Sequence, residues 1–510
     1  TGEGIVAFVT NNSFLDGNTH RTMRQELLRV FDEIYILNLH GSSRLKEKTP
    51  EGGKDENVFD IQTGVSINLL VKKQNSEPKQ PATLRYAEQY GLREEKYETL
   101  NALRLDSPLW KELTPHAPNY FFVEKDLASA QTYEKGFSLV ELFESYSVGA
   151  VGGRDKVAIH FDKKETKQMV RNIVSMETEA LRTLCGCGED SNTWKLQNAI
   201  DDIRRNKDNL TSITLSYRPY DNRSAVYTGS NAGIFLRSLY KKLGVLLHPA
   251  NFALCATRFV KASDVYHHCF IAKSVLEKCF VSNGPCESTY AFPLYRLPAG
   301  QNYTPAELVA GKTRASQPIP LELNMRPEVL AKISAAVGEP VSGEELFDYV
   351  YGVLHDPEYR IKYFEFLKIG YPRIPYPRDL AEYRSFATRG ARLRRLHLMD
   401  DSLDLPLVAT FDIAGTNEVT TVRYEKMTTE AGQEQEGKVW INDTQYFNHV
   451  PRRVWDHYVG AYQPARFWLQ KRVGRRLDSD DVRWYLRVCA TIAAESCADA
   501  YAPNIHCTPK

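Results

Sequence analysis

The sequence lacks three features that would each place it in a broad class of protein. No apolar run approaches the roughly eighteen residues of a membrane-spanning helix, and no charged segment followed by an apolar one opens the chain. Net charge is also almost absent, since 65 Lys and Arg residues balance 64 Asp and Glu residues. We therefore expect an intracellular, cytoplasmic protein with no membrane partner. Any nucleic-acid surface on it must come from local clustering of charge.

Regularly spaced cysteines are absent as well. Two close pairs could ligate a metal, Cys185 with Cys187 and Cys279 with Cys286, but neither has a second pair at zinc-like spacing. The sequence therefore predicts no metal site. The other cysteines that lie in apolar stretches are typical of reduced, buried thiols: Cys255, Cys269, Cys489 and Cys497.

Cofactor and catalytic motifs are also missing. No G-x-G-x-x-G occurs, and residues 310–313, which read Ala-Gly-Lys-Thr, lack the first glycine of a phosphate loop because Ala306 stands there. Asp264, His267 and His268 have no further ligand at helical spacing. We expect no ATP site and structural roles for these residues.

The first segments predict a sheet domain. At 510 residues the chain is long enough for about three domains of ordinary size. Apolar, β-branched runs at residues 4–10, 33–39 and 63–72 predict strands, and residues 23–31 show the spacing of a helix. Residues 119–123 predict another strand. This order is typical of part of an α/β sheet.

A hairpin is predicted at residues 216–223, which read Ser-Tyr-Arg-Pro-Tyr-Asp-Asn-Arg. Pro219 fixes φ at the start of the turn, and Asp221 and Asn222 tolerate the left-handed conformation that a hairpin needs. Arginine forks match phosphates and guanine edges, so the hairpin could contact a nucleic acid. Alternatively, its arginines pair with carboxylates of the same domain, which composition alone favours. The hairpin brings two tyrosines and two arginines together at one end: Tyr217, Arg218, Tyr220 and Arg223.

Residues 136–325 alternate short strand-like runs with helices, as in an α/β or α+β module. Gly152 and Gly153 predict a loop where the backbone can approach a partner closely. Arg154 beside them could contact a phosphate or satisfy local backbone groups. The helix-like stretch at residues 234–243 has a basic face, for which a solvated surface is the simpler interpretation.

The pattern after about residue 324 is helical. Ser342 with Glu345 predicts a capped helix, and Asp356 with Pro357 predicts the start of a second helix that ends near residue 368.

Two later segments carry basic residues. Three prolines in residues 371–378 exclude a helix or a central strand, so Arg373 and Arg378 project from an extended chain. That chain suits a wall of a DNA cleft or, equally, a linker packed between domains. Residues 468–477 hold the densest basic cluster, for which phosphate contact and a solvated surface are equal alternatives. Its members are Lys471, Arg472, Arg475 and Arg476.

Motifs spread along the chain resemble those of one family. Residues 4–17, Arg24, the strand to Leu39 and residues 59–67 resemble late catalytic-domain motifs of adenine-specific DNA methyltransferases with a C-terminal target-recognition domain. More narrowly, the chain is similar to the single-chain Type ISP restriction-modification enzymes. The other matching segments are residues 110–122, 152–155, 217–223, 292–295, 349–360, 371–375 and 468–477.

Two motifs of that family are missing here. The chain has neither the Asn/Asp-Pro-Pro-Tyr/Phe motif that holds the flipped adenine nor the glycine-rich S-adenosylmethionine motif. In the family both lie upstream of the point where this chain begins, and nuclease and helicase regions lie further upstream. The resemblance therefore implies that no cofactor binds this chain, that S-adenosylmethionine belongs to the parent enzyme, and that the chain alone is inactive.

The resemblance implies a fold of the α/β plus α+β class. Residues 1–126 are expected to be a remnant of a Rossmann-like methyltransferase sheet, residues 127–325 a mixed target-recognition lobe, and residues 326–510 a mainly helical C-terminal lobe. The expected partners are double-stranded DNA and the upstream methyltransferase, helicase and nuclease regions. The expected DNA-contacting residues are Arg154, Tyr217, Arg218, Tyr220, Asn222, Arg223, Arg373, Arg378, Lys471, Arg472, Arg475 and Arg476.

Two alternatives stay open. The chain could be a non-enzymatic interaction or scaffold protein whose aromatic, arginine-rich surfaces bind another protein, or it could be a stand-alone enzyme. DNA affinity that falls steeply with salt would favour DNA recognition over a scaffold. Methylation by this polypeptide would favour the enzyme.

Overall fold

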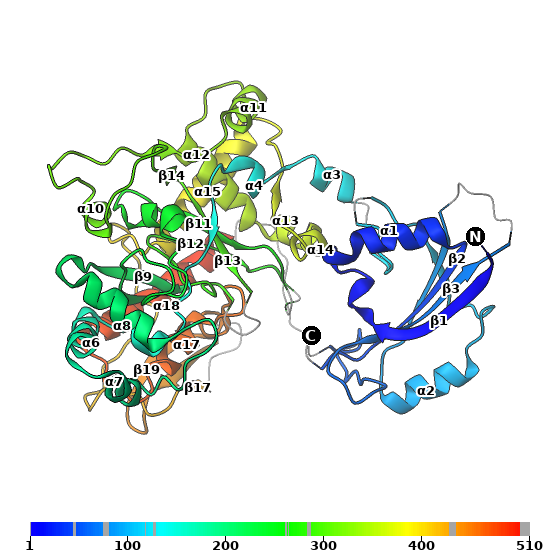
Figure 1. Ribbon diagram of the computed structural model, residues 1–510, viewed down its shortest axis with the longest axis horizontal. Helices are drawn as coiled ribbons and strands as arrows, with labels where there is room; N and C mark the ends of the chain where they lie inside the picture. The colour runs from blue at the N-terminus through cyan, green and yellow to red at the C-terminus, as the bar shows by residue number, and fades with distance from the viewer. Residues whose placement is uncertain are drawn as a thin grey trace. The chain divides into compact units, whose positions relative to one another are not determined.

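The computed structural model describes residues 2–43, 47–74, 81–117, 119–125, 129–260, 263, 265–282, 287–427 and 435–499. The chain divides into two compact units, Thr1–Ala130 and Gln131–Ile505, and Figure 1 colours the first of them blue to cyan. Each unit has its own hydrophobic cores. Among the residues so described, no helix is long and apolar enough to cross a membrane.

The first unit is built on a five-stranded sheet with the order β1-β3-β2-β4-β5, in which β2 and β4 run parallel and the other neighbours run antiparallel. The strands and the helix that were expected up to residue 72 are confirmed. Ile34 and Ile36 of β2 and Leu70 of β3 lie in the core, whereas β1 is an edge strand whose apolar side chains are largely exposed. A Rossmann-like sheet is mainly parallel, so a methyltransferase origin of this mixed sheet stays a prediction. The elements are β1 (Gly4–Asn11), α1 (Arg21–Val30), β2 (Glu33–His40), β3 (Val65–Lys72), β4 (Thr83–Glu88), α2 (Arg93–Ala102) and β5 (Lys111–Leu113).

The strand expected at residues 119–123 is wrong: the described residues of that segment form no ladder. The buried guanidinium of Arg24 donates to the carbonyl oxygens of Asn119 (2.6 Å) and Tyr120 (2.8 Å), which a strand would use for pairing. Tyr120 also has a φ of 48°, outside the range of a strand. Burial lowers the pKa of Arg24 to about 10. The carbonyl oxygens of this segment therefore satisfy the hydrogen-bond donors of the buried Arg24 guanidinium.

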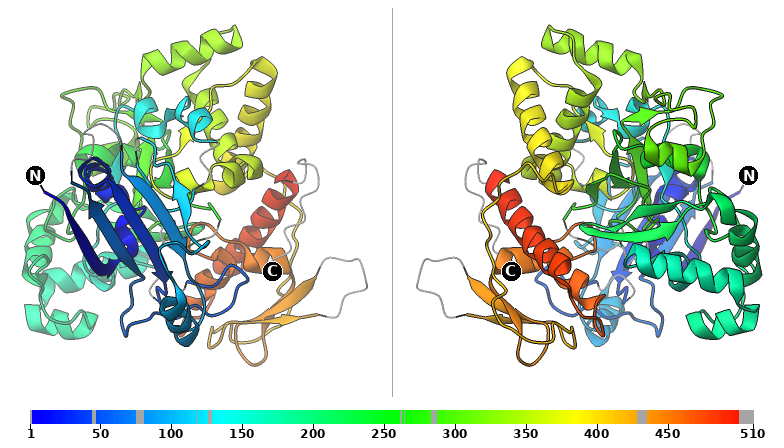
Figure 2. Two further views of the ribbon diagram at one scale, coloured as in Figure 1. Left: turned by 90° about the vertical axis from the view of Figure 1, so that its right-hand side faces the viewer. Right: turned by 90° about the vertical axis from the view of Figure 1, so that its left-hand side faces the viewer.

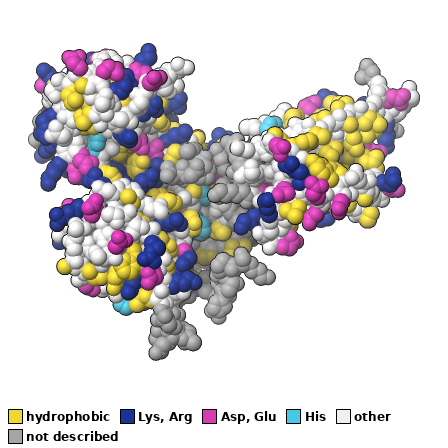
Figure 3. Space-filling model, turned by 90° about the horizontal axis from the view of Figure 1, so that it is seen from below, with side chains coloured by type: hydrophobic (Ala, Val, Ile, Leu, Met, Phe, Trp, Pro, Cys, Tyr) yellow, Lys and Arg dark blue, Asp and Glu magenta, His cyan; other side chains and the backbone are white. Residues whose placement is uncertain are grey.

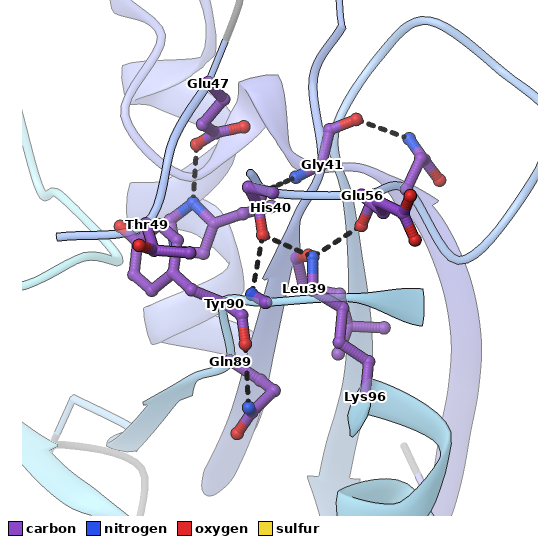
Figure 4. Close-up of polar contacts among 12 residues, drawn as sticks. Leu39, His40, Gly41, Glu47, Thr49, Glu56, Gln89, Tyr90 and Lys96 are labelled. Carbon is purple, nitrogen blue, oxygen red and sulfur yellow. Dashed lines mark hydrogen bonds and ion pairs between the residues drawn. The ribbon is translucent and has the colours of Figure 1, made fainter. Parts of the chain in front are cut away.

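A buried polar network lies at the end of β2. The His40 ring stacks on Tyr90 with 3.8 Å between ring centroids, and its two nitrogens contact Glu47 (2.7 Å) and Glu88 (3.2 Å). Nearby, the Lys96 ammonium donates to the carbonyl oxygens of Leu39 and Glu56, as Figure 4 shows. Burial lowers the pKa of His40, but the two carboxylates outweigh it and hold this pKa above its usual value.

The second unit contains five small sheets instead of one large one. They have the orders β8-β10-β9, β12-β11-β13-β7, β14-β15, β16-β6 and β17-β18-β19. Their strands are β6 (Phe137–Ser138), β7 (Ser147–Val148), β8 (Ile159–His160), β9 (Ser212–Arg218), β10 (Asp221–Val226), β11 (Ala253–Thr257), β12 (Cys269–Ala272), β13 (Thr289–Pro293), β14 (Tyr295–Arg296), β15 (Glu322–Leu323), β16 (Arg373–Ile374), β17 (Arg423–Lys426), β18 (Glu436–Trp440) and β19 (Tyr446–Pro451).

Helices surround these sheets. The longest, α18, is red in Figure 2 and packs against α15, α16 and α17. The three-stranded sheet β17-β18-β19 lies within residues 326–510, so this part of the chain is mixed as well. The helices are α3 (Ala130–Glu134), α4 (Leu139–Leu142), α5 (Asp155–Ala158), α6 (Lys163–Ser175), α7 (Thr178–Cys185), α8 (Leu196–Arg205), α9 (Tyr240–Leu243), α10 (Pro305–Ala310), α11 (Pro327–Val337), α12 (Gly343–Leu354), α13 (Pro357–Lys362), α14 (Phe364–Leu367), α15 (Leu380–His397), α16 (Arg452–Asp456), α17 (Pro464–Gln470) and α18 (Ser479–Asp499).

The predicted caps of the helical region are confirmed. The side chain of Ser342 accepts from the Glu345 N–H (3.2 Å), and that of Asp356 accepts from the Tyr359 N–H (2.8 Å). The second helix is interrupted at Tyr363, so α13 and α14 replace one continuous helix.

The helix expected at residues 234–243 is reduced to the single turn α9. Leu239 has a φ of 54°, and the side-chain oxygen of Asn231 accepts from the backbone N–H of Ser238 (2.9 Å). The buried carboxylate of Asp202 likewise accepts from the Ile234 N–H (3.0 Å). The expectation is wrong because side chains take backbone donors that a helix would have used.

Candidate nucleic-acid interface

The predicted hairpin is confirmed as β9 and β10, which pair antiparallel across a turn at Pro219 and Tyr220. The left-handed residue is Tyr220, with a φ of 60°, and not Asp221 or Asn222. This conformation is strained for a tyrosine, and burial of the ring compensates. The ring lies edge-on to Phe270 at 5.1 Å, and Trp484 Nε1 donates to the Tyr220 carbonyl oxygen (2.8 Å).

The strand register shifts between Asp221 and Asn222. Asp221 lies opposite Arg218 while Asn222 lies opposite Ser216, so Tyr217 has no residue directly opposite it. This is a β-bulge, which bends the strand and re-aims its side chains. Asn222 is consequently exposed between two buried neighbours.

Asp221 is the centre of a buried charge cluster. Its carboxylate is fully buried and accepts from both Nε (3.0 Å) and Nη2 (2.7 Å) of Arg223. Nη2 of Arg472, from the segment after α17, reaches the same carboxylate at 3.3 Å. Burial lowers the pKa of Arg472, and Asp221 offsets part of this effect. The cluster joins the hairpin to a segment far away in sequence.

Phe161 completes this cluster from a loop beside β8. The guanidinium of Arg223 lies 3.6 Å from the centre of its ring, and that of Arg475 lies 3.9 Å from it. Arg475 also pairs with Glu165 at 2.7 Å. Arg223 is thus engaged inside the protein, and the partly exposed Arg475 is held by an aromatic ring and a carboxylate of the same unit.

The other side of the hairpin is held in the same way. Nη1 of Arg218 pairs with Glu277 at 2.6 Å, and the Tyr217 hydroxyl donates to Asp155 Oδ2 at 2.8 Å. Burial lowers the pKa of Arg218, but Glu277 outweighs it, so this pKa is raised. The alternative in which the hairpin arginines pair with carboxylates of their own domain describes Arg218 and Arg223.

Arg154 lies in the predicted glycine loop and is bound locally. It donates to the carbonyl oxygens of Cys187 (3.0 Å) and Glu189 (3.3 Å). At Gly153, whose φ is 84°, a Cβ would overlap the ring of Trp194. The close approach that the glycines allow is thus made by a tryptophan of the same unit.

The proline-rich segment is extended, as predicted, and β16 pairs with β6. Arg373 donates to the Gly136 carbonyl oxygen (3.1 Å) and pairs with Glu141 (3.2 Å). Arg378 pairs with Glu382 at 3.0 Å, but 83% of its side chain is exposed. Arg378 therefore keeps a surface that a partner can reach.

Three of the expected residues are exposed and have no side-chain hydrogen bond or ion pair to another described residue: Asn222, Lys471 and Arg476. We call these three the rim. Figure 3 shows Lys and Arg side chains interspersed with Asp and Glu on the face that it draws, so a large basic patch is absent from that view of the described residues. Contact with DNA by the rim stays a prediction.

Sequence reasoning missed other exposed lysines near the hairpin. α6 packs against β10 and presents Lys163, Lys164 and Lys167, and Lys273 follows β12. A capping aspartate, Asp162, placed directly before two lysines was the available signal for the helix. No sequence signal linked Lys273 to it.

The histidine pair His267 and His268 lies within the fold of the second unit. His268 Nε2 lies 3.3 Å from Glu287 in the interior, and burial lowers the pKa of His267 to about 3. Asp264 lies outside the described residues. Within the described part of the chain, no group of three or more His, Cys, Asp or Glu residues could hold a metal ion.

Three solved structures resemble this fold. They are the ATP-dependent Type ISP restriction-modification enzyme LlaBIII bound to DNA (TM-score 0.69, 19% identity), a DrdV-DNA complex (0.68, 19%) and a nuclease-deletion mutant of the Type ISP enzyme LlaGI with a DNA substrate mimic (0.63, 16%). The matches cover 98 to 99% of this chain but only 33%, 51% and 39% of those chains. At these identities the likeness concerns the fold.

The curated proteins contain no match to this sequence. A family model does match: the Type ISP C-terminal specificity domain aligns with residues 141–493, which is well over half of the chain. This range includes the hairpin, the Asp221 cluster and the rim. The chain belongs to the Type ISP C-terminal specificity domain family.

Proposed function

We infer that this chain recognises a target sequence in double-stranded DNA as the specificity part of a restriction-modification enzyme. The observation that carries this proposal is the family match over residues 141–493. The three similar structures support it, since each was solved with DNA or a DNA mimic.

The geometry of the hairpin supports this proposal. The bulge holds Asn222 outward between the buried residues Asp221 and Arg223. An amide can form two hydrogen bonds with an adenine edge, and fixed neighbours reduce the entropy lost on binding. Lys471 and Arg476 add unpaired positive charge for phosphates, which set the register on the duplex.

The complete enzyme, in this proposal, is an adenine-specific DNA methyltransferase that uses S-adenosylmethionine. The first unit would be the end of its methyltransferase domain, and helicase and nuclease regions would precede it. Extruding an adenine costs a few kcal/mol of stacking and pairing. A specificity domain that grips the site would offset this cost, and this chain would supply no catalytic residue.

A salt titration separates this function from the scaffold alternative. We expect fluorescence anisotropy to show binding of a mixed-sequence duplex at low salt, with affinity that falls steeply as salt rises. A pool of random duplexes, enriched through repeated binding, should converge on one short asymmetric site. Absence of DNA binding even at low salt would contradict the proposal.

A further inference from the structure

A cavity of about 350 Å³ lies beside the hairpin in the second unit. Its volume is within the range of roughly 300–1,000 Å³ that small-molecule sites occupy. Its walls come from β9, β12, the start of α6, the end of α15 and α18. These elements are distant in sequence, so the fold alone creates this cavity.

The charge of the cavity is one-sided. Lys163, Arg218 and Lys273 line it, and none of its described lining residues is Asp or Glu. Arg218 is already paired with Glu277. Lys163 and Lys273 are exposed and have no side-chain hydrogen bond or ion pair to another described residue. The two lysines therefore offer uncompensated positive charge to an anion.

One wall of the cavity is a polar strip. Ser212, Thr214 and Ser216 alternate along β9 and so share one face of the strand. Asn222 lies opposite Ser216 in the register and extends the strip at the mouth. Hydroxyl and amide groups at this spacing suit the polar edge of a heterocycle or the hydroxyls of a sugar.

The floor is apolar and aromatic. Phe270 and Phe280 are buried with 2% exposure, and Trp484 and the Tyr220 ring lie with them in the lining. The Tyr220 hydroxyl is buried and lacks a hydrogen-bond partner among the described residues. A buried polar group of this kind calls for a ligand or an ordered water.

We propose that this cavity binds a nucleotide. The planar base lies against the aromatic floor, its edge or the sugar faces the strip of β9 and Asn222, and the phosphate lies at Lys163 and Lys273. The ligand is either a free nucleotide or a nucleotide that leaves the stack of a bound duplex. Only the second source depends on the proposed function.

Calorimetric titration of the full chain with the four deoxynucleoside monophosphates tests the free source. We expect saturable binding that weakens by about tenfold for each of Lys163→Ala and Lys273→Ala, since each variant removes one charged contact to phosphate. Deoxyadenosine, which has no phosphate, should bind weakly and equally to all three proteins. Both lysines are exposed, so both variants should fold normally.

A second cavity supplies a matched control. It has a volume of about 340 Å³, Lys241 and Lys242 line it, and no described Asp or Glu does. Lys241→Ala should leave nucleotide binding unchanged. Equal losses in Lys241→Ala and Lys163→Ala would overturn the assignment of the site.

The duplex source is tested with a target enriched from random duplexes, in which 2-aminopurine replaces one base at a time. A fluorescence change at a single position, lost in the Lys163→Ala/Lys273→Ala variant, supports the cavity as the receptor. Saturable free-nucleotide binding with no such change also supports it and identifies the source as solution. Absence of both signals overturns the inference. DNA affinity without either signal would leave the proposed function intact.

Discussion

The buried arginines in and beside the hairpin differ from the exposed residues of the rim in whether they are free to contact a partner. Arg218, Arg223 and Arg472 are each at most 7% exposed, and each has a carboxylate partner within the unit. The rim residues Asn222, Lys471 and Arg476 have no such partner among the described residues. The arginines of a dense basic and aromatic hairpin can therefore stabilise the fold itself, while exposed neighbouring residues stay available for contact with a partner.

The largest effect should come from breaking the buried side. Asp221→Ala leaves the buried Arg223 without a carboxylate partner and leaves Arg472 with only the more distant Asp481 (3.6 Å), so the free energy of unfolding should fall by about 3–5 kcal/mol. Urea denaturation followed by tryptophan fluorescence would measure the loss. The matched control is Asp401→Ala, which removes an exposed partner of Arg487 and should change little. Equal stability of the two variants would show that the cluster does not hold the hairpin.

Removing the amide of the rim should act on sequence preference. Asn222→Ala should leave the free energy of unfolding within about 0.5 kcal/mol. It should lower affinity for the enriched site by about 1–3 kcal/mol and relax preference at one base pair. Competition between the enriched site and its single-base variants would show this, with Asn198→Ala on α8 as the control. A uniform loss over all sequences would assign Asn222 to the backbone instead.

The basic residues of the rim should have a smaller, sequence-independent effect. Lys471→Ala and Arg476→Ala should each weaken binding to any duplex and reduce the slope of log affinity against log salt by about 1. Anisotropy titrations at several salt concentrations would provide the slope. Lys332→Ala, on the exposed face of α11, should leave it unchanged. A rim variant that keeps the parental slope would be removed from the interface.

The sequence predicted local structure well where the residues that determine an element lie within the same short segment. The hairpin, the caps at Ser342 and Asp356, and the first strands follow from turn chemistry and apolar spacing. The Asp221 cluster could not be predicted, because Arg472 lies 251 residues away in sequence. The failed strand at residues 119–123 and the failed helix at residues 234–243 have one cause. In each, side chains from elsewhere bind the backbone groups that a regular element needs.

Which arginines are exposed and which are held by other side chains is determined by the fold and not by the local sequence. Arg475 and Arg476 are adjacent and identical in chemistry, yet Arg475 stacks on Phe161 while Arg476 is exposed. The family resemblance predicted the specificity domain, and only the fold sorts its basic residues.

The smallest effect should come from a buried ion pair far from the hairpin in sequence, at His40. Its folded pKa is raised, so its contribution to stability is complete below the usual value of 6.5 and is lost as pH rises through the raised pKa. Hydrogen exchange of the amides in β2 and β4 should therefore speed up over that range beyond its intrinsic pH dependence. His40→Gln should abolish the extra acceleration, and His116→Gln, at an exposed histidine of the same unit, should keep it. If His40→Gln keeps the parental profile, protonation of His40 does not contribute to stability. The His40 network would then differ from the Asp221 cluster, whose charges are expected to stabilise the fold.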